Sequence, residues 1–129
     1  MHAPPKTLNL KDLSKSFLYA FNGIRIIVLS QRHGYIYLIA TIVIGLTGLL
    51  LQISRLEWCW IIIAAVSVWT AEAINTAFEF LCDVASPEFH PLVEKAKDAA
   101  AGAVLLCTMG AAAIGLLILG PPLFKILKG

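Results

Sequence analysis

The sequence predicts an all-α integral membrane protein with three transmembrane helices and one amphipathic helix at the membrane surface. Of its 129 residues, 59% are hydrophobic and 14% are charged, and the mean hydropathy is +0.83. A soluble domain of this length could not bury so much apolar surface, so the chain is predicted to be one membrane domain over residues 1–129. The net charge of +2 comes without a run of Lys or Arg, which argues against a nucleic-acid partner.

The first predicted element is a surface helix over residues 12–30. Its apolar side chains recur at helical spacing, but Lys15, Asn22 and Arg25 interrupt them. The segment is therefore too polar to span a bilayer and too apolar to dissolve in water. The apolar positions are Leu13, Phe17, Leu18, Phe21, Ile24 and Val28.

Three apolar segments long enough to cross a bilayer follow. Residues 35–53 carry no charge. The second span, residues 57–83, would be about 40 Å long at ~1.5 Å per residue, so its last turns would project beyond a hydrocarbon core of about 30 Å. A polar loop is predicted over residues 84–97. The third span covers residues 98–119, and the sequence Gly120-Pro121-Pro122 is predicted to end it.

Lys and Arg residues set the expected orientation. They are more frequent before the first span and in the 84–97 loop than between the first two spans. Cytoplasmic loops carry an excess of these residues, so we expect the N-terminus and the 84–97 loop in the cytoplasm. Lys125 and Lys128 argue mildly against this orientation.

The second span carries a polar stripe near its end. Glu72, Asn75, Glu79 and Asp83 fall, together with Thr76, within an arc of about 100°, because each helical residue turns by about 100°. An acid at the centre of a membrane helix costs roughly 2.5–3.5 kcal/mol. A stripe of this kind therefore indicates a function that needs the acids.

The stripe has two alternative explanations. The acids could pair with Arg25 or Lys97 to hold helices together, but attraction within a buried ion pair seldom offsets its desolvation. Alternatively, Glu72 could be the carrier site of a small ion- or proton-coupled transporter. The first span is free of charge and the polar groups gather at one edge, which favours an enzyme at the membrane surface.

The polar residues fit phosphate chemistry. Mg²⁺ usually takes one or two protein carboxylates together with substrate phosphates. Lys97 lies beside Asp98, just after the stripe in sequence, and a Lys can supply positive charge to a phosphoryl group in transfer while a carboxylate accepts a hydroxyl proton.

These residues carry a resemblance to a known family. The segment "EAINTAFEFLCD", followed by "SPEFHPLVEKAKDAAAGAVLL", closely resembles the prokaryotic membrane diacylglycerol kinase and undecaprenol kinase family. The resemblance extends to "SFLYAFNGIR" and "LQISRLEW", and it covers about residues 14–120. It implies a kinase of the bacterial cytoplasmic (inner) membrane that moves the γ-phosphate of MgATP to a lipid alcohol, diacylglycerol or undecaprenol. It also implies a homotrimer whose sites are shared between subunits.

The resemblance also implies a role for each matching residue. Glu72 would be the general base on the lipid hydroxyl, Glu79 a metal ligand that also contacts the nucleotide, and Asn75 and Asp83 supports of the site. The other expected nucleotide contacts are Tyr19, His90, Lys97 and Asp98. Taken without the resemblance, His90 is an ordinary loop histidine.

One position departs from the family pattern. After the "GIR" element the family usually carries an acid that shares the metal, and the matching residue here is Gln31, followed by Arg32 and His33. A neutral amide binds Mg²⁺ less well than a carboxylate does, so Gln31 is a doubtful metal ligand. An inactive relative that serves as an assembly partner therefore stays open as an alternative. His33 could replace a family residue or lie among lipid headgroups, and the second interpretation is favoured.

Overall fold

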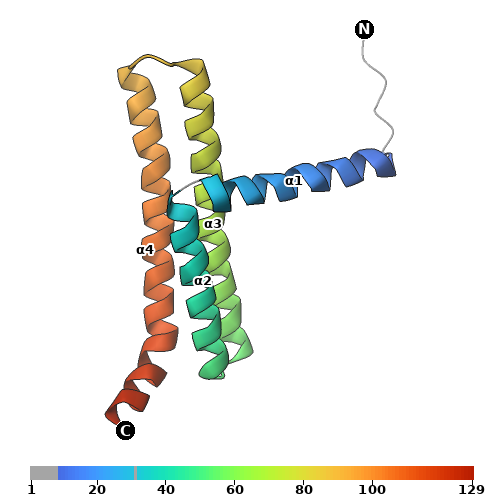
Figure 1. Ribbon diagram of the computed structural model, residues 1–129. Coiled ribbons are helices and arrows are strands. Elements are labelled where there is room, and N and C mark those ends of the chain that lie inside the picture. Colours follow the sequence, from blue (N-terminus) through green and yellow to red (C-terminus); the bar gives the residue numbers. More distant parts are fainter. Residues whose placement is uncertain (1–8, 31) are drawn as a thin grey trace.

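The computed structural model describes residues 9–30 and 32–129, which form four helices (Figure 1). These are α1 (Leu10–Ser30), α2 (Arg32–Leu50), α3 (Arg55–Ala85) and α4 (Pro91–Lys128). By length and composition, α2, α3 and α4 are each able to cross a membrane. The predicted all-helical membrane fold is thus confirmed.

Helix α1 projects sideways from the bundle of the other three helices (Figure 1). Its large apolar side chains find no cover within the chain: Phe17 is 58% exposed and Leu18 66%. A helix with such a face gains stability by burying it in the boundary between headgroups and acyl chains. The sideways direction of α1 fits the predicted surface helix.

A capping box starts α3. The backbone N–H of Glu57 donates to Ser54 Oγ (3.3 Å), and the backbone N–H of Ser54 donates to Glu57 Oε2 (2.7 Å). This reciprocal pair satisfies two N–H groups that the first turn of a helix otherwise leaves without partners. Gln52 takes a left-handed backbone conformation (φ 52°) in the short turn before it. The tight turn makes α2 and α3 antiparallel neighbours.

Aromatic and hydroxyl side chains connect α2 with α3. Trp69 Nε1 donates to Thr41 Oγ1 (3.0 Å), and the hydroxyl of Thr41 donates to the carbonyl of Tyr37 (2.7 Å). The Tyr37 and Trp69 rings meet edge to face with centroids 6.2 Å apart. Where apolar helices lack a hydrophobic drive to associate, such contacts determine how they pair. They lie one turn from Glu72 and fix that part of α3 against α2.

Helix α4 is longer than the sequence suggests. The predicted 84–97 loop is mostly helical, because α4 begins at Pro91 with His90 as its N-cap. Proline at a first helical position is favourable, since the N–H it lacks would have had no partner there. Asp98 therefore lies two turns inside α4 and does not open the helix. Glu94 is the acid of the first turn.

The prediction that Gly120-Pro121-Pro122 ends the last helix is wrong. Helix α4 continues through both prolines to Lys128, and it changes direction towards its C-terminal end (Figure 1). Each proline removes one backbone hydrogen bond and its ring presses on the preceding turn, which bends a helix without always ending it. The outcome here is a bent helix.

Gly34 allows the close corner between α1 and α2. A Cβ atom added there would collide with the carbonyl oxygen of Ile27 and lie 2.7 Å from that of Val28. Backbone atoms cannot move aside as a flexible side chain can, so Gly34→Ala should displace α1 and cost about 1–3 kcal/mol of stability. Thermal unfolding in detergent measures this loss. Gly45→Ala, on the same helix, is the control because a Cβ atom there meets nothing within 4 Å. The melting temperature of this variant should stay at or above the wild-type value. Equal melting temperatures for the two variants would contradict the proposed role of Gly34.

Candidate functional site

The polar stripe of α3 is buried at its inner end, around Glu72, while Glu79 is half-buried and Asp83 is exposed. Glu72 and Thr76 are each 2% exposed and Asn75 is 8% exposed, although most of the surrounding helix surface is open. Helix α4 runs antiparallel to α3, with Lys97 opposite Asp83. The small residues Ala99 to Ala103 therefore lie alongside the part of the stripe near Glu79, and small side chains let two helices approach closely.

Two buried polar atoms of the stripe have no partner within the described residues. Asn75 Nδ2 donates to Glu79 Oε1 (3.3 Å), which leaves Asn75 Oδ1 free. Thr76 Oγ1 is also buried without a partner. Buried polar atoms are seldom left in this state, and the exceptions need an explanation. Because Asn75 Nδ2 contacts Glu79 Oε1, an amide oxygen and a carboxylate lie close together on α3.

The donor set suits a metal ion that is shared with a substrate. Among the residues described, no three His, Cys, Asp or Glu side chains group closely enough to hold a metal by themselves. Mg²⁺ does not need such a group, because it keeps waters and takes one or two carboxylates plus phosphate oxygens. Glu79 with the unpartnered Asn75 Oδ1 fits that requirement.

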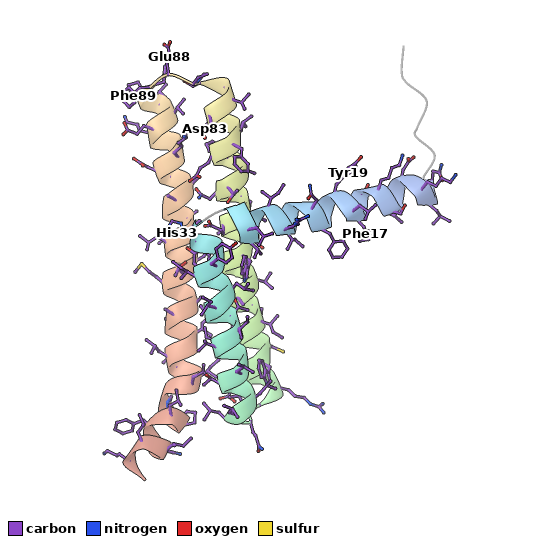
Figure 2. All side chains as sticks on the ribbon, in the orientation of Figure 1. Phe17, Tyr19, His33, Asp83, Glu88 and Phe89 are labelled. Carbon is purple, nitrogen blue, oxygen red and sulfur yellow. The ribbon has the colours of Figure 1, made fainter. Side chains whose placement is uncertain are left out.

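His33 lies within electrostatic reach of Glu72, although the sequence interpretation favoured a place among lipid headgroups. It lies at the corner where α1 meets α2, near α3 (Figure 2), and it interacts electrostatically with Glu72. Glu79 also interacts electrostatically with Glu72. The favoured interpretation of His33 overlooks its interaction with Glu72. The available signal was its position, two residues after Gln31 at the start of the first span.

A second cluster lies where α3 and α4 extend beyond the level of α1. Asp83 accepts a hydrogen bond from the Lys97 ammonium, and Lys97 also interacts electrostatically with Glu79. The cluster borders a hollow of about 320 Å³ under the α3–α4 turn. Its polar lining residues are Asp83, Ser86, Glu88, His90, Glu94, Lys97 and Asp98. Figure 2 shows Asp83 below Glu88 and Phe89 of this turn.

His90 has a structural role that explains its place in the chain. Its Nδ1 accepts a hydrogen bond from the backbone N–H of Leu92 (3.2 Å), which caps the N-terminus of α4. The other ring nitrogen, Nε2, then carries the proton. An N-cap shapes the start of a helix, so His90 fixes the geometry of the hollow even before any contact with a ligand.

One of the residues implied by the resemblance, Tyr19, is not brought to these clusters. Tyr19 is 73% exposed on α1, and it lies away from the α3–α4 hairpin (Figure 2). Gln31 lies outside the described residues, so its proposed share in metal binding stays a prediction. The other expected residues lie along one path from Glu72 through Asn75 and Glu79 to the hollow.

An apolar groove approaches Glu72 from the opposite side. It has a volume of about 650 Å³ and is bordered by α2, α3 and α4. Its border on α3 ends with Val68 and Trp69. Glu72 follows Val68 by one turn and therefore lies on the same face. Along α3, the Glu72 carboxylate thus lies between the apolar groove and the polar cluster.

Comparison with known proteins identifies this arrangement. The family model described as prokaryotic diacylglycerol kinase matches residues 18–119. The chain belongs to the prokaryotic diacylglycerol kinase family. It is 36% identical to the undecaprenol kinase of Bacillus subtilis (strain 168) over 114 residues, which is 88% of this chain and 93% of that protein.

Two diacylglycerol kinases are also similar. The protein of Synechocystis sp. (strain ATCC 27184 / PCC 6803 / Kazusa) is 31% identical over 90% of this chain and 67% of its own length. The protein of Helicobacter pylori (strain ATCC 700392 / 26695) is 33% identical over 80% of each chain. No solved structure matches the chain.

Membership of the diacylglycerol kinase family makes the chain a multi-pass membrane lipid kinase. A kinase implies ATP as the phosphate donor, and family membership favours the kinase interpretation over the transporter alternative. Relatives acting on two different lipids are similar at 31% to 36% identity, so family membership does not by itself define the acceptor.

Proposed function

We propose that this kinase transfers the γ-phosphate of MgATP to the hydroxyl of undecaprenol, with diacylglycerol as the alternative acceptor. The observation that carries the proposal is the position of Glu72. This buried carboxylate lies between an apolar groove and the cluster formed by Glu79, Asp83 and Lys97. A lipid alcohol would enter from the membrane and a nucleotide from the water, so that their reacting groups meet at Glu72.

Glu72 would act as the general base. A base must reach the proton it removes, and its carboxylate must be kept from other partners until the substrate arrives. No described residue forms a hydrogen bond with the Glu72 carboxylate that would have to break first. The electrostatic interaction with His33 would help to keep the carboxylate at the corner between α1 and α2.

Glu79 would hold Mg²⁺ with help from Asn75, and the Gln31 side chain would be a weaker neutral partner. When bound, the ion would neutralise charge on the phosphate oxygens and hold the phosphates in line with the acceptor. Asn75 Nδ2 already orients the Glu79 carboxylate. The unpartnered Asn75 Oδ1 would gain a partner in the loaded site.

The hollow under the α3–α4 turn would receive the nucleotide. Lys97 would exchange Asp83 for a phosphate, and Asp98 and His90 would contact other parts of the nucleotide. Tyr19 would reach this hollow only from a neighbouring copy, as in a homotrimer with shared sites. The hollow would face the cytoplasm, where ATP is found, which agrees with the Lys and Arg distribution.

The apolar groove would receive the hydrocarbon chain of the acceptor. Its lining is almost entirely apolar, with Thr41, Thr108 and the Trp69 indole at the end near Glu72. The higher identity to an undecaprenol kinase over nearly its full length supports a polyprenol chain there.

Comparing kcat/KM for undecaprenol and for diacylglycerol in mixed micelles tests the choice of acceptor. The proposal expects the larger value with undecaprenol. A larger value with diacylglycerol would reassign the acceptor while leaving the kinase chemistry in place.

Lys97 provides a test of the nucleotide site. Its ion pair with Asp83 is largely exposed, and such pairs contribute only about 0–1 kcal/mol to stability. Lys97→Met should therefore fold normally but raise KM for ATP by about tenfold or more, because a hydrogen bond from a charged group to phosphate is lost. Steady-state kinetics and thermal unfolding measure the two effects. Lys95→Met, also exposed on α4, is the matched control, and an equal rise in KM for both variants would contradict the assignment.

A further inference from the structure

The last two turns of α4 lie beyond what the bilayer core requires. Residues 98–120 already cover about 34 Å at ~1.5 Å per residue, which exceeds a core of about 30 Å. Helices α3 and α4 are antiparallel with Lys97 opposite Asp83, which places Gly120 opposite Trp60, near Trp58 and the start of α3. Trp side chains prefer the headgroup layer. Residues 121–128 therefore begin at the membrane surface, at the end of the bundle away from Glu72.

A straight continuation into water would be unfavourable. Leu127 is 84% exposed, Ile126 66% and Phe124 59% within the chain. Large apolar side chains that project from the membrane into water lose the stabilisation that burial of their surface would provide. The bend near Pro121 and Pro122 turns the segment aside from the direction of the span (Figure 1).

The segment separates charge from apolar surface. Lys125 and Lys128 are three residues apart and lie on one face of the helix, while Leu123, Ile126 and Leu127 lie on the other side. The ammonium of Lys128 stands over the Phe124 ring, 4.8 Å from its centroid, which joins an aromatic ring to the charged face. Lysines and aromatic rings on such a helix suit the boundary between acyl chains and phosphate headgroups.

We propose that residues 121–128 lie along the bilayer surface and bind anionic lipid headgroups through Lys125 and Lys128. The segment lies outside the matched family region of residues 18–119, and the proposal does not depend on the kinase activity. The partner is the phosphate of an anionic phospholipid, because two lysines on one face supply the complementary charge while the opposite face enters the acyl layer.

Spin labels on the full chain in phosphatidylcholine–phosphatidylglycerol vesicles test the position of the segment. Labels are placed at Leu127→Cys and, as the control in the exposed α3–α4 turn, at Glu88→Cys, with the three native cysteines replaced by alanine. The proposal expects the label at 127 to be accessible to oxygen and protected from a water-soluble nickel reagent, and the label at 88 to show the reverse. Nickel access at 127 equal to that at 88 would overturn it. So would protection of 127 from both reagents, which would indicate packing against a protein surface.

The role of the lysines is tested by lipid selectivity. The preference of the reconstituted protein for spin-labelled phosphatidylglycerol over phosphatidylcholine is measured for wild type, K125Q/K128Q and the charge-preserving K125R/K128R. The preference should fall by up to about fivefold per lysine in the Gln variant, which corresponds to roughly 1 kcal/mol for each cation near an anionic surface. It should be retained in the Arg variant. An unchanged preference in K125Q/K128Q would contradict the proposed binding.

Discussion

Glu72→Gln is expected to lower the rate of phosphate transfer by about 10²–10⁴-fold, the usual contribution of a general base. Glutamine has the same size and fills the same buried place, but it cannot accept the proton of the lipid hydroxyl. The rate of labelled phosphate transfer from ATP to the lipid at saturating substrate measures this effect.

The fold should not suffer from this substitution. Glu72 is 2% exposed, and a buried carboxylate in a membrane helix is costly, so its neutral replacement should leave the melting temperature equal or higher. Asp12→Asn, exposed in the first turn of α1, is the control and should keep full activity. A Glu72→Gln protein that retains most of its rate would show that another group removes the proton.

Glu79→Gln is expected to weaken the apparent affinity for Mg²⁺ by at least about tenfold, the lower limit seen when groups around a metal are altered. The new amide oxygen can still accept the hydrogen bond from Asn75 Nδ2, which is 3.3 Å long in the native chain. The local structure is therefore preserved while one negative charge is removed. The dependence of rate on Mg²⁺ concentration at saturating ATP measures the change.

High Mg²⁺ separates metal binding from a structural defect. If Glu79 holds the ion, excess Mg²⁺ should restore much of the activity of Glu79→Gln but none of that of Glu72→Gln. A rate that stays low at every Mg²⁺ concentration, with unchanged half-saturation, would assign Glu79 a role other than metal binding.

Most of the fold follows from hydropathy and length. The three spans and the surface helix are predictable because each needs only a periodic or continuous apolar pattern. The predicted positions of the two ends of α4 were wrong for local reasons. His90 and Pro91 form a favourable helix start inside a segment whose polarity suggests a loop. The prolines at 121 and 122 bend the helix and do not end it. A proline pair alone does not tell a bend from an end, so the sequence could not distinguish the two outcomes.

The candidate site could be predicted only in part. The stripe on α3 lies on one helix, so its common face follows from spacing alone. The partnership of Asp83 with Lys97 and the interaction of His33 with Glu72 join different helices. Their proximity depends on the register of α4 and on the α1–α2 corner at Gly34. That corner in turn depends on backbone contacts, which no side-chain pattern in the sequence reports.

The most direct test of the central claim is transfer of labelled γ-phosphate from MgATP by the purified natural chain. Undecaprenol and diacylglycerol are offered in separate mixed micelles, and Gln31→Glu is measured in parallel. The account predicts transfer to undecaprenol that requires Mg²⁺, and a faster Gln31→Glu variant because a carboxylate binds the ion more strongly than an amide does. No transfer to either lipid by the natural chain, with nucleotide still bound, would contradict the account and indicate a kinase scaffold without its chemistry.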